Sequence, residues 1–170
     1  MKLLRKIAHP FFKRYYFWYH RKKRIYKYKN CSAVVYPGLF SPHFTTSTKI
    51  LLDFISEREL KNKRVLELGC GCGIISVFAA SKGAEVTASD INSAAIQAVN
   101  ESAMKNGFKI NAIESDLLEK TDVNSFDLII INPPYYPKNP SDINESAWYC
   151  GENFEYYEKV HWIYIVLQLY

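Results

Sequence analysis

Between residues 64 and 131, short apolar segments alternate with segments of helical periodicity, and this rhythm constrains the fold more than any other feature of the chain. Helices are predicted at residues 74–83 and 91–107, and each ends on a glycine, as helix C-termini commonly do. Strands are predicted at residues 64–68, 84–89, 109–115 and 126–131. Strands that alternate with helices indicate βαβ units, so we expect an α/β fold with a doubly wound, mainly parallel sheet.

Less regular segments flank this central part. Tyr36-Pro37-Gly38 predicts a turn, and the run from Thr45 to Thr48 predicts the start of a helix over about residues 47–58, with hydroxyls that can cap free N–H groups. A short polar connection is expected around Leu117 to Asn124. The remaining predictions are a proline-rich loop at 132–142, a helix near 152–159 and, at 161–170, a segment that can form a fifth strand.

Positive charge is concentrated at the start of the chain. The sequence has 22 Lys and Arg against 17 Asp and Glu, a net charge of +5. Residues 1–30 contain eleven of the 22 cations and nine of the aromatic residues, and Asp53 is the first carboxylate. Residues 31–170 therefore carry 11 − 17 = −6. We divide the chain into a basic aromatic arm with a lead-in (1–45) and a domain (46–170).

The basic arm has three interpretations. We favour contact with RNA or the ribosome, because clustered cations attract phosphates. A solvated face whose aromatic residues cover the rest of the chain is the second interpretation, and contact with a membrane surface is the third.

Length and composition restrict the class of protein. With 170 residues, 48% hydrophobic and 23% charged, the sequence is typical of one globular domain, and no apolar run is long enough for a membrane span. We expect no membrane association by a span, a cytoplasmic location and reduced thiols at Cys31, Cys70, Cys72 and Cys150, since no secretory signal precedes them. The Cys70-x-Cys72 pair lacks a second ligand pair at zinc spacing, so no metal is expected.

Each predicted strand is followed by residues typical of a binding site. The four sets are Gly69-Cys70-Gly71-Cys72-Gly73, Asp90, Asp116 and Asn132-Pro133-Pro134-Tyr135. In open parallel sheets, ligands bind beyond the carboxyl ends of the strands, where these residues would meet. Asp90 lies 90 − 69 = 21 residues after Gly69, a spacing typical of a carboxylate that holds a ribose. These features predict a nucleoside cofactor.

The nucleoside is more consistent with S-adenosylmethionine than with a nicotinamide dinucleotide. The dinucleotide fingerprint requires glycine at position 74, where this chain has Ile74. Glu67, two positions before the first glycine, is poorly placed for an anionic pyrophosphate and suits a cationic amino group. A nicotinamide-dependent dehydrogenase is the alternative from another enzyme class.

On these motifs the sequence resembles the class I S-adenosylmethionine-dependent methyltransferases, and more narrowly the small NPPY group of release-factor glutamine and nucleic-acid amino methyltransferases, over about residues 40–160. The family fold implies a Rossmann-like sheet of strand order 3-2-1-4-5. The resemblance implies that the glycine turn with Gly69, Gly71 and Gly73 cradles the cofactor and that Glu67 lies near its amino acid end. It further implies that Asp90 holds the ribose and that Asp116, with Leu117, borders the adenine. Asn132 is also implied as a cofactor contact. A looser lead-in match comprises Val34, Gly38, Phe40, Pro42, Thr46 and Thr48.

The Asn132 to Tyr135 tetrapeptide predicts how a planar amino group could be methylated. Such a nitrogen is a poor nucleophile because its lone pair is delocalised. The side-chain carbonyl of Asn132 and the backbone carbonyl of Pro133 can accept its hydrogens, and Tyr135 can stack on the planar group. Consecutive prolines make this loop rigid.

We therefore expect an N-methyltransferase that acts on a planar amino group of a nucleic acid, with RNA favoured, or of a protein glutamine. The family fold has seven strands, whereas residues 64–170 offer 107 positions and at most five strands. We accordingly expect a chain that lacks the last strands of the full fold, with an apolar sheet edge from Trp162 to Leu169 that favours self-association. A catalytically inactive, truncated cofactor-binding or RNA-binding remnant is the alternative.

Overall fold

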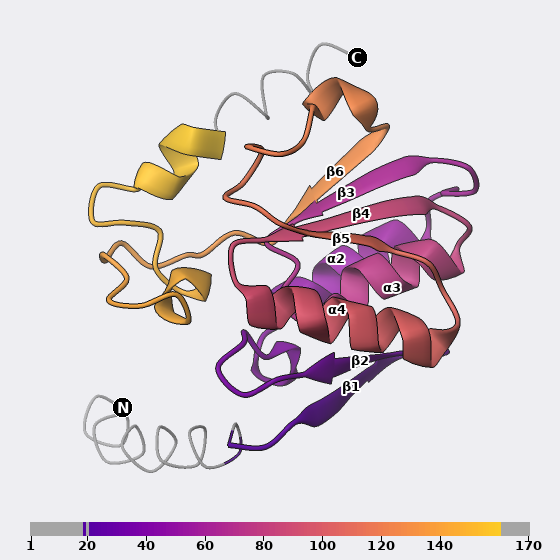
Figure 1. Cartoon of the computed structure of the whole chain (residues 1–170), viewed down its shortest axis with the longest axis horizontal. Helices are drawn as coiled ribbons and strands as arrows, with labels where there is room; N and C mark the ends of the chain where they lie inside the picture. Colours follow the sequence, from indigo (N-terminus) through magenta and orange to yellow (C-terminus); the bar gives the residue numbers. More distant parts are fainter. Residues whose placement is uncertain (1–18, 20, 161–170) are drawn as a thin grey trace.

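The computed structural model of the chain describes residues 19 and 21–160 (Figure 1). Its centre is a parallel sheet of order β5-β4-β3-β6. The strands are β3 (Arg64–Leu68), β4 (Glu85–Asp90), β5 (Asn111–Glu114) and β6 (Leu128–Ile131). The predicted α/β fold is confirmed, and the four strands have the expected order 3-2-1-4. The fifth predicted strand, at 161–170, and the edge proposed for self-association lie outside the described residues.

Three helices pack on one face of the sheet (Figure 1): α2 (Ser47–Ser56), α3 (Ile74–Ser81) and α4 (Ser93–Asn106). The bounds of α3 and α4 agree with the predicted helices to within two residues at each end. The expectation that the hydroxyls before α2 cap it is wrong. Thr46, at the N-cap position, makes no side-chain cap hydrogen bond, because its backbone is already helical (φ −90°, ψ −20°) instead of extended.

The opposite face of the sheet is covered by segments with little regular structure. Leu66, Leu68 and Ile129 pack there against the connection at 117–126, which includes the 3-10 turn η2 (Val123–Ser125), and against Val160. Residues 155–160 are helical and overlap the helix predicted near 152–159, which begins three residues earlier. Further 3-10 turns are η1 (Pro42–Phe44) and η3 (Glu145–Ala147). Within the described residues, no helix has the length and apolarity needed to cross a membrane.

An antiparallel hairpin of β1 (Arg24–Tyr28) and β2 (Cys31–Val35) lies on the far side of the helices from the sheet. The sequence left the opening stretch, within residues 1–30, open between a helix and a strand-rich lid, and it did not predict the pairing with β2. Cys31, Ala33 and Val35 are buried in the same core as α3. The division of the chain at residue 45 stays a prediction, although the described part of the first segment contributes to this core.

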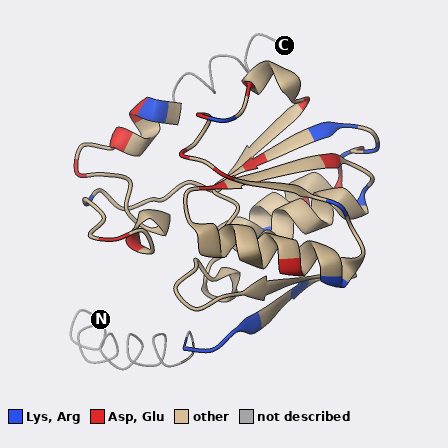
Figure 2. Cartoon of the chain, viewed as in Figure 1, with Lys and Arg blue, Asp and Glu red and all other residues tan. Residues whose placement is uncertain are grey.

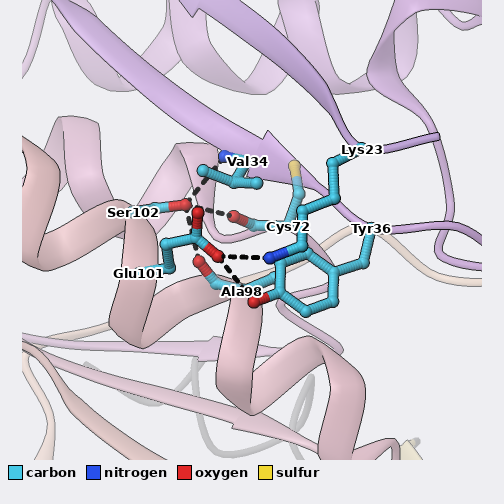
Figure 3. Close-up of polar contacts among 7 residues, drawn as sticks. All are labelled: Lys23, Val34, Tyr36, Cys72, Ala98, Glu101 and Ser102. Atoms are coloured by element: carbon cyan, nitrogen blue, oxygen red, sulfur yellow. Dashed lines mark hydrogen bonds and ion pairs between the residues drawn. The ribbon is translucent and has the colours of Figure 1, made fainter.

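Polar contacts join the hairpin to α4 (Figure 3). The backbone N–H of Val34 donates to Ser102 Oγ (2.8 Å), whose hydroxyl lies 2.6 Å from the Ala98 carbonyl. Lys23 Nζ (2.8 Å) and the Tyr36 hydroxyl (2.6 Å) both donate to Glu101 Oε2. The side chains of α4 thus provide partners that a neighbouring strand would otherwise supply to β2.

Gly73, at the N-terminus of α3, allows α3 and α4 to approach closely. Its φ is +72°, and a Cβ atom there would lie 2.6 Å from Val99 Cγ2. Gly107, which ends α4, has a similar φ of +75°, but a Cβ atom there would meet nothing within 4 Å. The two glycines differ in packing and share the same backbone requirement.

We expect Gly73→Ala to destabilise the chain more than Gly107→Ala. Both substitutions place a Cβ in the left-handed region, at about 1 to 2 kcal/mol, and Gly73→Ala adds overpacking against Val99, at about 1 to 3 kcal/mol. Urea unfolding of the two variants measures the difference in the free energy of unfolding. Equal losses would show that Val99 moves aside without cost.

Candidate functional site

The register of the parallel sheet brings the four strand ends together. Leu68 pairs with both Ser89 and Ile131, and Asp90 pairs with Glu114. The residues that follow these positions consequently lie at one edge of the sheet. They line a cavity of about 460 Å³, a volume typical of small-molecule sites.

Most of the residues predicted to form the site share this cavity. Its lining includes Glu67, Gly69, Gly71, Asp90, Asp116 and Asn132. Gly73, Pro133 and Tyr135 are not part of that lining. The individual role of each residue stays a prediction.

The glycine loop after β3 leaves open space on its cavity side. Gly69 and Gly71 have φ values of +69° and +52°, and a Cβ atom at either position would meet no atom within 4 Å. The N–H groups of Gly69 and Cys70 donate to the Ser89 carbonyl (2.8 and 3.0 Å). The loop is therefore fixed to β4 while its backbone remains open to close approach by a ligand.

Asp90, at the end of β4, is tied to this loop. Its Oδ2 accepts the Gly71 N–H and its Oδ1 accepts the Asn92 N–H, both at 2.9 Å. Burial raises the pKa of Asp90, and these backbone hydrogen bonds oppose the rise. A carboxylate has about four acceptor positions, so each oxygen can still accept a hydroxyl of a ribose.

Glu67, in β3, is a buried carboxyl beneath the loop, with 4% of its surface exposed. The Ser76 N–H donates to its Oε2 (2.8 Å), and the Ser76 hydroxyl donates to the same oxygen. Burial raises the pKa of Glu67 to about 8, although the Ser76 hydrogen bonds act in the opposite direction. A cationic group bound in the cavity would stabilise the charged form of Glu67.

Asp116, beyond β5, lines the cavity beside Leu117. Its Oδ2 lies 3.2 Å from Nζ of Lys159, which lines the cavity as well. Both side chains of this ion pair are substantially exposed, so its contribution to stability is small. The pair joins the connection after β5 to the helical residues 155–160 at the cavity wall.

The Asn132 side chain has hydrogen bonds at both ends of its amide. Its Nδ2 donates to Thr48 Oγ1 (3.4 Å), and its Oδ1 accepts the Tyr135 hydroxyl (2.7 Å). Tyr135 is 49% exposed, so its ring is accessible to a planar group that approaches from solvent. The Pro134 carbonyl accepts the Tyr157 hydroxyl (2.9 Å), whereas no described residue donates to the Pro133 carbonyl.

The segment after Tyr135 forms another wall of the cavity. The sequence favours plain packing over a pocket wall for Trp148, Tyr149 and Cys150, and of these three Tyr149 and Cys150 line the cavity. That wall includes Asn139, Pro140, Ile143, Asn144, Tyr149, Cys150 and Tyr156. The loop that carries most of them is closed at its base, where the Tyr136 N–H donates to the Trp148 carbonyl and the Cys150 N–H donates to the Tyr136 carbonyl (both 3.0 Å). This proline-rich segment has no periodicity that could have indicated which side chains face inward.

The lead-in segment forms another part of the wall. Gly38, Phe40, Pro42 and Thr48 line the cavity.

Within residues 19 and 21–160, no group of three or more His, Cys, Asp or Glu could hold a metal ion.

Comparisons with known proteins agree on one family. The family described as "Methyltransferase small domain" matches residues 30–147. A Methanocaldococcus jannaschii protein that carries the name of a protein N5-glutamine methyltransferase is 42% identical over 85 residues, which are 49% of this chain and 43% of that protein. The ribosomal RNA small subunit methyltransferase C of Alcanivorax borkumensis is 32% identical over 108 residues, which are 62% of this chain and 33% of that protein.

A solved structure shares the fold. It is the T. thermophilus 16S rRNA N2 methyltransferase in complex with AdoMet and guanosine, at a TM-score of 0.60 and 25% identity, over 73% of this chain and 36% of that chain. The chain thus spans less than half of the length of each of these three proteins.

We expect the stability of the wild-type chain to fall with rising pH because of Glu67. Its folded pKa of about 8 lies above the ordinary value of 4.5, so between these pH values the folded state keeps a proton that the unfolded state has lost. Glu67→Gln, which mimics the protonated form, removes this dependence. From pH 5 to pH 8 the variant should gain on the order of 3 kcal/mol relative to the wild type.

Urea unfolding of both chains at several pH values measures this difference. Other titrating groups cancel in the comparison, because both chains contain them. Parallel stability curves would show that Glu67 is ionised in the folded chain near neutral pH.

Proposed function

The chain belongs to the methyltransferase small domain family, and from this membership we propose that it is an S-adenosylmethionine-dependent N-methyltransferase for a planar amino group of RNA or of a protein glutamine. The observation that carries the proposal is the single cavity lined by Gly69, Asp90 and Asn132, which come from three strand ends. S-adenosylmethionine supplies an electrophilic methyl group bound to a sulfonium sulfur.

The residues around the cavity fit this cofactor. The open space beside Gly69 and Gly71 lets the cofactor approach the backbone of the loop closely. The free acceptor positions of Asp90 suit the two ribose hydroxyls. Glu67 suits the amino group, since no described residue donates to its Oε1. Asp116 and Leu117 would border the adenine.

Asn132 and Pro133 would hold the amino group that receives the methyl. Asn132 Oδ1 and the Pro133 carbonyl accept its two hydrogens, so that the nitrogen lone pair points away from both toward the cavity. Tyr135, half exposed beside them, would stack on the planar substrate. Fixing the reacting atoms in line contributes about 7 to 11 kcal/mol to lowering the barrier.

RNA is the substrate that the charge distribution favours. Cations are spaced along β1 and the residues before it (Figure 2). Arg21, Lys22 and Lys27 are exposed, and within the described part of the chain they form no ion pair. The T. thermophilus neighbour is an rRNA methyltransferase with bound guanosine, which also favours an amino group of a base.

A protein glutamine is the second candidate substrate. The name of the M. jannaschii relative favours it, and an amide NH₂ has the same planar geometry as a base amino group.

We place the reaction in the cytoplasm, where thiols such as the four free, buried cysteines stay reduced. Labelled-methyl transfer to total RNA and to ribosomal protein extract distinguishes the two substrates, and transfer to neither would indicate a cofactor-binding chain without turnover.

We expect Asn132→Ala to reduce methyl transfer by about 10²- to 10³-fold, the usual effect of losing one polar group that orients the reacting atoms. Cofactor affinity, measured by calorimetry with S-adenosylmethionine, should change little. Asn100→Ala, at an exposed position of α4 that does not line the cavity, is the matched control. Full turnover by Asn132→Ala would remove Asn132 from the proposed role.

The cations of the hairpin should determine the salt dependence of RNA binding. Replacing Arg21, Lys22 and Lys27 together by Gln should flatten the slope of log affinity against log salt by up to ~2, because each phosphate contact on single-stranded RNA contributes ~0.7. The control is a triple Gln variant of Lys61, Lys63 and Lys109, which are exposed and precede β3 and β5. Fluorescence anisotropy with labelled single-stranded RNA measures both; equal slopes would place the RNA elsewhere.

A further inference from the structure

Tyr157, in the helical residues 155–160, contacts the loop that carries the proposed chemistry. Its hydroxyl donates to the Pro134 carbonyl at 2.9 Å, across 23 positions of the chain. Pro134 is buried and Tyr157 is partly buried. Because a carbonyl oxygen can only accept a hydrogen bond, the hydroxyl must be the donor in this contact.

The contact holds one particular peptide group. The Pro134 carbonyl belongs to the same planar unit as the Tyr135 N–H, which donates to the Trp148 carbonyl at 3.2 Å. Both polar atoms of the Pro134–Tyr135 peptide are therefore bonded, the oxygen to a side chain and the nitrogen to the backbone. These two partners fix the plane from which the Tyr135 side chain extends.

Packing holds the Tyr157 ring in place. Its centroid lies 6.3 Å from that of the Phe154 ring and 5.8 Å from that of the Tyr156 ring, which it meets edge-on. Three residues further on, Val160 is 1% exposed and packs in the core with Leu66 of β3. The hydroxyl thus connects a segment anchored in the core to a loop with little regular structure of its own.

The anchor is most important for a chain that holds its substrate. The Tyr135 hydroxyl donates to Asn132 Oδ1, the oxygen proposed to accept the amino group of the substrate. An amino group that binds there weakens or displaces the hydroxyl. Since half of the Tyr135 surface is exposed, packing alone holds only part of its ring. The position of the ring then depends on the backbone contacts of Tyr135.

We propose that Tyr157 is a positioning residue that fixes the Pro134–Tyr135 peptide and thereby aligns the Tyr135 ring with the planar group of the substrate. Tyr157 does not line the cavity, so it acts through this peptide and not by touching the cofactor. The inference rests on the proposed function and adds to it a residue from outside the Asn132 to Tyr135 motif.

Kinetics with Tyr157→Phe test the proposal. The substitution keeps the ring and removes the donor, so kcat for methyl transfer should fall by about threefold to tenfold, the effect of one lost hydrogen bond. Tyr26→Phe is the matched control, because Tyr26 is another partly buried tyrosine and does not line the cavity. An unchanged kcat in Tyr157→Phe would overturn the proposal.

A double-mutant cycle distinguishes positioning through Tyr135 from a general loss of structure. In a chain with Tyr135→Ala no ring remains to be aligned, so the further change Tyr157→Phe should alter kcat by less than about twofold. The Kd for S-adenosylmethionine should be the same in Tyr157→Phe and in the wild type. Equal fold-losses of kcat in both backgrounds would contradict the proposal, as would a weaker Kd that accounts for the lost turnover.

Nuclear magnetic resonance tests the contact without any turnover. Pro134–Tyr135 is the only Pro-Tyr pair in the sequence, so a full chain labelled with ¹³C-carbonyl proline and ¹⁵N-tyrosine gives a single signal that joins the two labels. Its carbonyl shift should move in Tyr157→Phe and stay near the wild-type position in Tyr26→Phe. An unmoved signal in Tyr157→Phe would overturn the inference. A wild-type chain that methylates neither RNA nor protein would instead overturn the proposed function, and the spectra would still decide on the contact.

Discussion

The parallel register of β3, β4, β5 and β6 is the constraint on which the rest of the site depends. Because Leu68, Ser89 and Ile131 are aligned across the sheet, the chain leaves each strand at the same edge. Side chains from distant parts of the sequence then meet without any long loop to bring them together. Backbone hydrogen bonds of the sheet thus determine the geometry, and the side chains at the strand ends determine the chemistry.

Two acidic residues connect this sheet to the glycine loop in different ways. Asp90 accepts two backbone N–H groups and keeps unused acceptor positions on a partly buried carboxylate. Glu67 is buried deeper, bonds to Ser76 at the start of α3, and has a pKa raised to about 8 by that burial. Asp90 thus holds the loop through hydrogen bonds. The ionisation of Glu67, in contrast, depends on the charge of the group that is bound in the cavity.

Much of this arrangement was predictable from local patterns, since the strands, α3, α4 and the residues after each strand have clear periodicity or characteristic types. The hairpin was not predictable in this way. In β1 the apolar Ile25 is exposed whereas the more polar Tyr26 and Tyr28 are partly buried, the reverse of the usual pattern for a half-buried strand. The contact of Thr48 with Asn132 was equally hidden, since the two residues are 84 positions apart and a hydroxyl at the start of a helix normally indicates a cap. Long-range contacts of single polar atoms leave no periodic signal in a sequence.

The hairpin also has a practical consequence for how the chain can be divided. Tyr36 is held by Glu101 of α4, and two residues later the chain continues into Gly38, Leu39 and Phe40, which line the cavity. An expression fragment that starts at the compositional boundary near residue 45 would omit this stretch and expose the apolar side of α3 and α4 to solvent. Protease nicking between β2 and α2 would have a similar result, so residues 24–45 should stay intact in a preparation that is to bind a ligand.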